Sequence, residues 1–190
     1  MGFRDTLNAV LGTTRLPKSN LDKLFAISTA YITMQTELNL KPAPAAGICF
    51  KPIESSRFDA ARNEIEELLR FSSKESGTTF RIETDEYRFI WVILTDPDFE
   101  DLVAGIHLIS LTLIDKGFGE YLLCAIFRFG NGKPVYWVYN FKQGRYYPFI
   151  PAAGKTRDNA SEFRIRSWME KELPMENDVE RWYPLWGIPL

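Results

Sequence analysis

The sequence predicts an α+β fold, in which helices pack on a mostly antiparallel sheet within a single domain. Segments with helical periodicity alternate with short runs rich in aromatic and β-branched residues, in the order α-β-α-ββ-α-βββ-α. The last strands are separated by tight turns of glycine and asparagine, which connect antiparallel neighbours. A chain of 190 residues with a hydrophobic fraction of 45% is long and apolar enough to bury one core.

The first 20 residues are expected to precede the domain as an amphipathic segment and a linker. They begin with a short apolar stripe at helical spacing, formed by Phe3, Leu7, Val10 and Leu11. The stripe is weakly charged, so we expect at most a peripheral contact between residues 1–12 and a membrane. Asn20, at the end of the linker, is a suitable N-cap for the helix that follows.

The domain itself is expected to span residues 21–174. A first helix is predicted over residues 21–38, where apolar side chains recur at helical spacing. The segment 41–47 contains two prolines and a glycine and should interrupt regular structure. A short strand, ICFK at 48–51, then ends at a proline.

A second helix is predicted over residues 57–73, with Ser55 or Ser56 as its cap. One face of this segment is apolar at a period of 3.6 residues and the other is acidic and solvated. Two alternating runs, 79–84 and 87–94, follow a short loop and indicate a β-hairpin.

A third helix is predicted over residues 99–117, which are apolar around much of the helix circumference. This helix should therefore be the central buried one. Asp96 is the expected N-cap, Pro97 suits the first helical position, and acidic residues fill the first turn. Gly117 should end the helix.

Three strands and a last helix complete the domain. The strands are expected at 121–129, 134–141 and 145–150, and the turns between them carry glycine and asparagine. A helix over residues 158–172 should end before Pro174. The remaining residues, 175–190, form an aromatic tail that contains three prolines or glycines in its last seven positions.

No catalytic constellation is visible in the sequence, and we expect neither a cofactor nor a metal. The one histidine, His107, lies in a predicted helix without a cysteine or carboxylate at a spacing typical of a site. The glycine-rich stretches 116–119 and 130–133 match neither a Walker A loop nor a dinucleotide fingerprint. Cys49 and Cys124 lie in apolar, strand-like runs and should be buried, reduced thiols.

The overall charge disfavours nucleic acid as a partner. Twenty-three basic and 25 acidic residues give a net charge of −2, whereas binding along a phosphate backbone needs a basic excess. No segment resembles a signal peptide or is apolar for long enough to span a membrane. We therefore expect a cytoplasmic protein that contacts at most the inner face of the membrane.

An aromatic contact surface is the best candidate for a functional site. The predicted hairpin at 136–149 and the tail concentrate tyrosine and tryptophan beside basic residues. The residues expected to contact a protein partner are Tyr136, Tyr139, Arg145, Tyr146, Arg181, Trp182 and Trp186. The tail residues Trp182, Leu185 and Trp186 should also lie mainly against the domain, because a free apolar strip would be an aggregation hazard.

Several stretches resemble the PspAB family, the PspA-associated proteins of bacteria and archaea. These are MGFRDTL at the start, GICFKP (47–52), YRFIWVILTDPDFEDLVAGIH (87–107), GFGEYLLCAIFRF (117–129), PVYWVYNFKQGRYYPF (134–149), RDN (157–159) and RWYPLWG (181–187). The element order is also similar to that of type III secretion chaperone-like and YbjN-like modules, a likeness that implies fold alone.

The resemblance implies a role beside PspA, a membrane-remodelling phage-shock protein, or beside a membrane protease of the HtpX type. It supplies no catalytic residues. We therefore expect a non-catalytic adaptor of the envelope-stress response that binds a protein partner near the membrane. An alternative is an escort-type chaperone that holds a helical or extended segment in a groove, for which a homodimer is compatible with the sequence. An enzyme of unknown type is the less favoured alternative.

Overall fold

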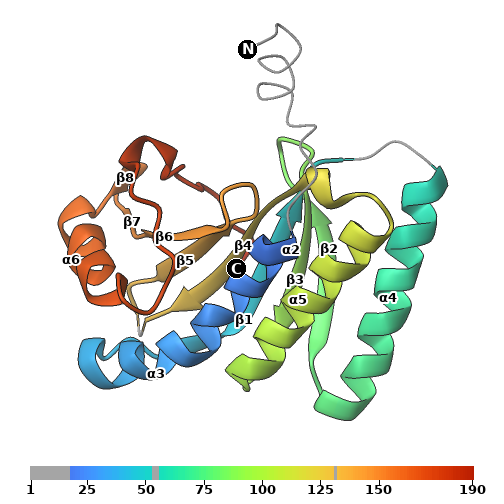
Figure 1. Cartoon of the computed structure of the whole chain (residues 1–190), viewed down its shortest axis with the longest axis horizontal. Coiled ribbons are helices and arrows are strands. Elements are labelled where there is room, and N and C mark those ends of the chain that lie inside the picture. Colours follow the sequence, from blue (N-terminus) through green and yellow to red (C-terminus); the bar gives the residue numbers. More distant parts are fainter. Residues whose placement is uncertain (1–17, 53–55, 131) are drawn as a thin grey trace, which may run out of the picture.

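The computed structural model describes residues 18–52, 56–130 and 132–190, and it confirms a single α+β domain with the predicted order of elements (Figure 1). Its centre is a six-stranded sheet in the order β2-β3-β1-β4-β5-β6, and every neighbouring pair is antiparallel. The strands are β1 (Pro42–Phe50), β2 (Thr79–Thr84), β3 (Ile90–Thr95), β4 (Leu122–Phe129), β5 (Val135–Asn140) and β6 (Arg145–Phe149). Two further short strands, β7 (Pro151–Ala152) and β8 (Thr156–Arg157), pair with each other.

The helices α3, α4 and α5 cover one face of the sheet (Figure 1). The helical elements are α2 (Lys18–Asp22), η1 (Lys23–Ala26), α3 (Ile27–Leu38), α4 (Ser56–Ser76), α5 (Phe99–Asp115), η2 (Gly119–Tyr121), α6 (Asn159–Met169) and η3 (Val179–Arg181). The apolar α5 is central, as predicted, and buries Leu102, Ile106 and Ile109 against the sheet. A Cβ atom on Gly105 would lie 2.5 Å from Leu94 Cδ1, so the missing side chain lets α5 approach β3 closely.

The opposite face of the sheet carries a second apolar cluster. Alternate residues of β1, β3, β4, β5 and β6 point to this side, because successive side chains of a strand face opposite ways. The buried members are Cys49, Trp91, Ile93, Cys124, Ile126, Tyr136, Val138, Tyr147, Phe149 and Trp182. Side chains from the C-terminal residues pack against this cluster, so both faces of the central strands are covered.

Several predicted boundaries are wrong. Strand β1 begins at Pro42 rather than at residue 48. It pairs with β3 only from Ala45 onward, and its register against β4 shifts between Pro42 and Ala46. Prolines are tolerated at such irregular positions because the ladder needs no N–H group there. Helix α4 also extends through the predicted loop to Ser76.

The caps also differ from the prediction. Asp98, not Asp96, is the N-cap of α5, since its carboxylate accepts a hydrogen bond from Glu100 N at 2.9 Å. The buried Asp96 instead accepts hydrogen bonds from Asp98 N and from the Thr78 hydroxyl, which fixes the loop before the helix. Asn20 lies within α2 rather than before it, and its side chain donates to the Phe141 carbonyl.

The predicted stripe at residues 3–11 and the proposed membrane contact of residues 1–12 lie outside the described residues. Within the described ranges, no helix has both the length and the apolar character that a membrane crossing needs.

Candidate binding cavity beneath the C-terminal segment

Residues 182–190, here called the C-terminal segment, cross the second face of the sheet. Near its start, the Tyr147 hydroxyl of β6 donates to the Tyr183 carbonyl at 3.0 Å. Near its end, Arg81 of β2 donates to the Pro189 carbonyl. Because β6 and β2 are the two edge strands, the segment is held at both edges of the sheet.

The last residue packs on the middle of the sheet. A Cβ atom on Gly47 of β1 would lie 3.4 Å from Leu190 Cδ1, so the glycine leaves room for the leucine side chain. Trp186 packs edge-on against Phe149, with ring centroids 5.1 Å apart. The segment is therefore attached by side-chain packing as well as by hydrogen bonds.

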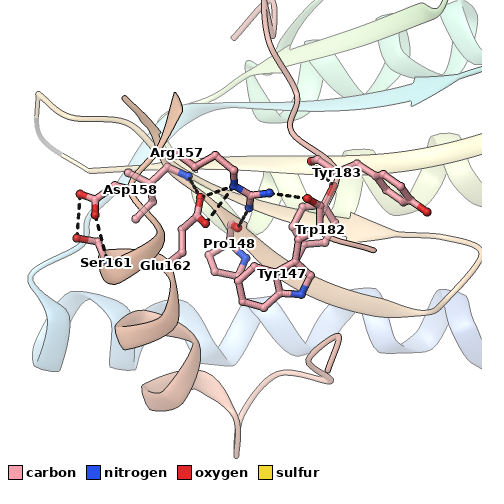
Figure 2. A network of polar contacts seen from close by, with 9 residues as sticks. Tyr147, Pro148, Arg157, Asp158, Ser161, Glu162, Trp182 and Tyr183 are labelled. Carbon is pink, nitrogen blue, oxygen red and sulfur yellow. Dashed lines mark hydrogen bonds and ion pairs between the residues drawn. The ribbon is translucent and has the colours of Figure 1, made fainter. Parts of the chain in front are cut away.

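A buried ion pair anchors the start of the segment (Figure 2). The Arg157 guanidinium lies against Glu162, with Nε 3.0 Å from Oε1. It also donates to the carbonyls of Trp182 and Pro148 and lies over the Phe149 ring. Glu162 is 1% exposed and accepts a further hydrogen bond from Ile150 N at 2.7 Å. Strand β6, helix α6 and the C-terminal segment are thus joined through two side chains.

Trp182 is buried next to this anchor. It is 3% exposed, and its ring is nearly parallel to that of Tyr147. Its indole Nε1 donates to the Glu176 carbonyl at 3.1 Å, so the polar atom is satisfied although the ring is buried.

A cavity of about 970 Å³ lies between one end of the sheet and the C-terminal segment. Its lining includes Cys49, Trp91, Leu123, Cys124 and Tyr147 from the sheet. Residues 183–189 of the C-terminal segment form another wall, to which Leu185, Trp186 and Ile188 contribute apolar side chains. This volume and this apolar lining are typical of a binding site.

The two cysteines lie side by side in the cavity wall. Cys49 of β1 and Cys124 of β4 are directly paired, and both thiols are free and buried, as predicted. The hydrogen bond to Cys124, burial and the negative charge of Asp85 together raise the pKa of Cys49 well above its ordinary value. A protonated thiol is a poor nucleophile, so the environment of Cys49 does not favour covalent catalysis.

Acidic side chains dominate the charged part of the lining. Glu83, Asp85, Glu86 and Glu120 contribute carboxylates, against the ammonium groups of Lys51 and Lys142. Asp85 is held in place, because it accepts hydrogen bonds from Tyr87 N, Phe89 N and the Trp91 indole. Glu83 pairs with Arg81 at 2.6 Å. Glu86 and Glu120 are exposed and form no ion pair with any residue that the structure describes.

The structure separates the residues that were expected to form one partner-contact surface. Tyr139 and Tyr146 face the helices, where their hydroxyls donate to the carbonyls of Asn20 and Leu24. Tyr136 is buried on the opposite face, as is Trp182. Helices and the C-terminal segment cover the two sides of the hairpin, so these four side chains are buried in the isolated chain.

The other predicted contact residues are more accessible. Arg145 and Arg181 are exposed; Arg145 donates to the Met175 carbonyl, and Arg181 pairs with Asp178 and Gln143. Trp186 is partly buried and lines the cavity. A partner contact by these three residues stays a prediction.

His107 does not belong to the cavity lining. His107 packs against Phe25, with ring centroids 4.4 Å apart, and burial lowers its pKa. In the described ranges, no three His, Cys, Asp or Glu side chains are close enough to hold a metal ion. The cavity, with its aromatic and aliphatic lining, is suited to binding an apolar group.

Sequence reasoning missed most of the residues that make this site. Trp91, Leu123 and Asp85 were assigned only to strands or to a turn. One signal was present: IWVIL (90–94) and LLCAIF (122–127) are continuously apolar, which indicates strands covered on both faces. Arg157 and Glu162 carried no local signal, because their pairing depends on how α6 packs against β6.

The family model of PspAB, PspA associated protein B, matches residues 1–190 of the chain. Neither a comparison with curated proteins nor one with solved structures finds a match.

Proposed function

Because the chain belongs to the PspA associated protein B family, we propose that it is a non-catalytic accessory protein that binds a PspA-type partner in an envelope-stress response. The observation that carries this proposal is the match over residues 1–190, since the description of the family is association with PspA. The apolar cavity, the raised pKa of the Cys49 thiol and the packing of His107 on Phe25 support a binding role.

A retention experiment tests the proposal. The chain is immobilised and incubated with the PspA-family protein of the same organism, with and without liposomes, beside an unrelated helical protein of matched size and charge. We expect specific retention of the PspA-family protein, and the liposome arm shows whether a membrane is required. Retention no greater than that of the unrelated protein in both arms would contradict the proposed function.

The cavity also favours a second candidate, an escort-type chaperone that holds a segment of its client. The two candidates differ in how the complex ends. An accessory protein stays bound to the assembled partner, whereas an escort is released when its client assembles. Size-exclusion chromatography of the chain with the PspA-family protein, before and after assembly of that protein, distinguishes them.

A further inference from the structure

The composition of the cavity lining indicates an apolar occupant. Aromatic and aliphatic side chains of the sheet form one wall, and Leu185, Trp186 and Ile188 contribute to the opposite wall. The wall formed by the C-terminal segment is held at both sheet edges, through Tyr147 and Arg81. The space therefore exists before a ligand enters, which lowers the entropic cost of binding.

The charge of the lining indicates that the occupant is also basic. Glu83 is paired with Arg81, which leaves Asp85, Glu86 and Glu120 against Lys51 and Lys142 around the cavity. The exposed Glu86 and Glu120 form no ion pair with a described residue. A lysine or arginine that approaches these carboxylates gains attraction, whereas an anionic headgroup is repelled.

Two exposed aromatic rings belong to the same lining. Tyr87 is 66% exposed and Tyr183 is 55% exposed, and they come from the β2–β3 turn and the C-terminal segment. Aromatic faces attract ammonium and guanidinium groups, so these rings reinforce the preference for a basic ligand.

We propose that this cavity is the docking site for an apolar segment of the protein partner that carries flanking lysine or arginine side chains. This inference rests on the proposed function and adds to it the place and the chemistry of the contact. The apolar side chains of the segment enter between the sheet and the C-terminal segment, and its basic side chains pair with Glu86 and Glu120.

Calorimetric titration with the PspA-family protein of the same organism tests this assignment. The test variant is Glu86→Lys/Glu120→Lys. The matched control, Glu67→Lys/Glu172→Lys, makes the same charge change at exposed residues outside the cavity. We expect the test variant to weaken affinity by about tenfold or more and the control by about twofold at most, because only the first places like charges against the ligand. Equal melting temperatures show that both variants are folded.

A photo-crosslinker provides a second readout that does not depend on affinity. Benzoylphenylalanine replaces Tyr87 or Tyr183 in the lining and, as a control, the exposed Phe71 on α4. Crosslinks to the partner from the two cavity positions and none from position 71 are expected.

The outcomes separate the two proposals. If the unchanged chain does not bind the partner, the proposed function fails and the docking assignment fails with it. If the chain binds but the test variant binds equally well, or crosslinks form only at position 71, the docking assignment is overturned and the proposed function stands. A homodimer that the test variant disrupts, or a small apolar molecule in the cavity that the partner does not displace in native mass spectrometry, also overturns it.

Discussion

Arg157 forms an ion pair with the buried Glu162, and the same guanidinium donates to the carbonyl of Trp182. The pair thus connects helix α6 to the start of the C-terminal segment, as Figure 2 shows. Its position makes it an anchor for one wall of the cavity.

Glu162→Ala should lower the free energy of unfolding by about 3 kcal/mol, because it removes the anion beside the largely buried Arg157 and leaves the Arg157 Nε–H and the Ile150 N–H without their acceptor. Urea denaturation measures the loss. Glu66 provides the control, since it is more accessible than Glu162 and pairs with the exposed Arg62 and Arg70, so that Glu66→Ala should cost about 0.5 kcal/mol or less. Equal losses in the two variants would show that the buried pair is not an anchor.

Trp182→Ala should lower the free energy of unfolding by about 3 kcal/mol or more, because a buried indole leaves a cavity that the surroundings fill only in part. Thermal and urea unfolding check this loss. Trp168→Ala is the matched control, since Trp168 is 52% exposed and its removal should change stability by about 0.5 kcal/mol or less.

Deletion of residues 181–190 should lower the melting temperature as well. A deletion variant that melts unchanged yet loses the partner would instead indicate a tail held out for binding.

Gly144→Ala should destabilise the β5–β6 turn for two reasons. Gly144 has φ of 63°, and an added Cβ atom would lie 2.5 Å from Asn20 Oδ1. Gly187→Ala controls for the first reason, since Gly187 has φ of 75° and nothing within 4 Å. We expect a loss of about 1 kcal/mol at Gly187 and a larger loss at Gly144.

A double-mutant cycle isolates the contact with Asn20. Because Asn20→Ala removes the atom that the new Cβ would meet, the loss for Asn20→Ala/Gly144→Ala should be smaller than the sum for the two single variants. Strict additivity in urea denaturation would contradict the close approach of α2 to this turn.

Asp158 should make stability depend on pH in the acid range. The Lys133 ammonium at 2.7 Å and hydrogen bonds from Ser161 lower the pKa of Asp158 from 3.8 to about 2. Since the pKa is lower in the folded chain, the stabilisation is present above about pH 4 and is lost as the pH falls toward about 2. Asp158→Asn keeps a capping oxygen for α6 and removes the charge. The melting temperatures of the variant and the unchanged chain should therefore differ at neutral pH and converge in acid.

The control for this titration is Asp59→Asn, at an exposed position in the first turn of α4. It makes the same substitution at a carboxylate that forms no ion pair with a described residue, so it reports the effect of the amide itself. A difference between Asp158→Asn and the unchanged chain that stays constant down to about pH 2 would show that the carboxylate gains nothing from Lys133.

Periodicity predicted the order of elements well because helices and strands here follow strong local patterns. The apolar stretch at 99–117 became the central helix α5, and the turns with glycine and asparagine became hairpins. Residue type alone did not fix where the helices and strands begin and end. Asp96 and Asp98 are both suitable caps by type, and the contact of Asp96 with Thr78, 18 residues away, decided between them.

The candidate site could be predicted only in part, because its residues come from segments that only the folded strand order brings together. Tyr139 and Tyr146 lie in a predicted hairpin that concentrates aromatic beside basic residues, and they were expected to contact a partner, but α2 and η1 cover them. The cavity combines the β2–β3 turn, the start of β4 and the C-terminal segment, which are distant in sequence. No spacing rule connects such segments before the strand order is known.

Hydrogen–deuterium exchange of the chain, alone and in complex with the PspA-family protein of the same organism, tests the central claim most directly. We expect slower exchange on binding at residues 83–91, 120–124 and 183–189, which surround the cavity. Exchange in the outer turns of α4 should not change. Protection confined to α3 or α4, with unchanged exchange around the cavity, would contradict the claim that the partner docks beneath the C-terminal segment.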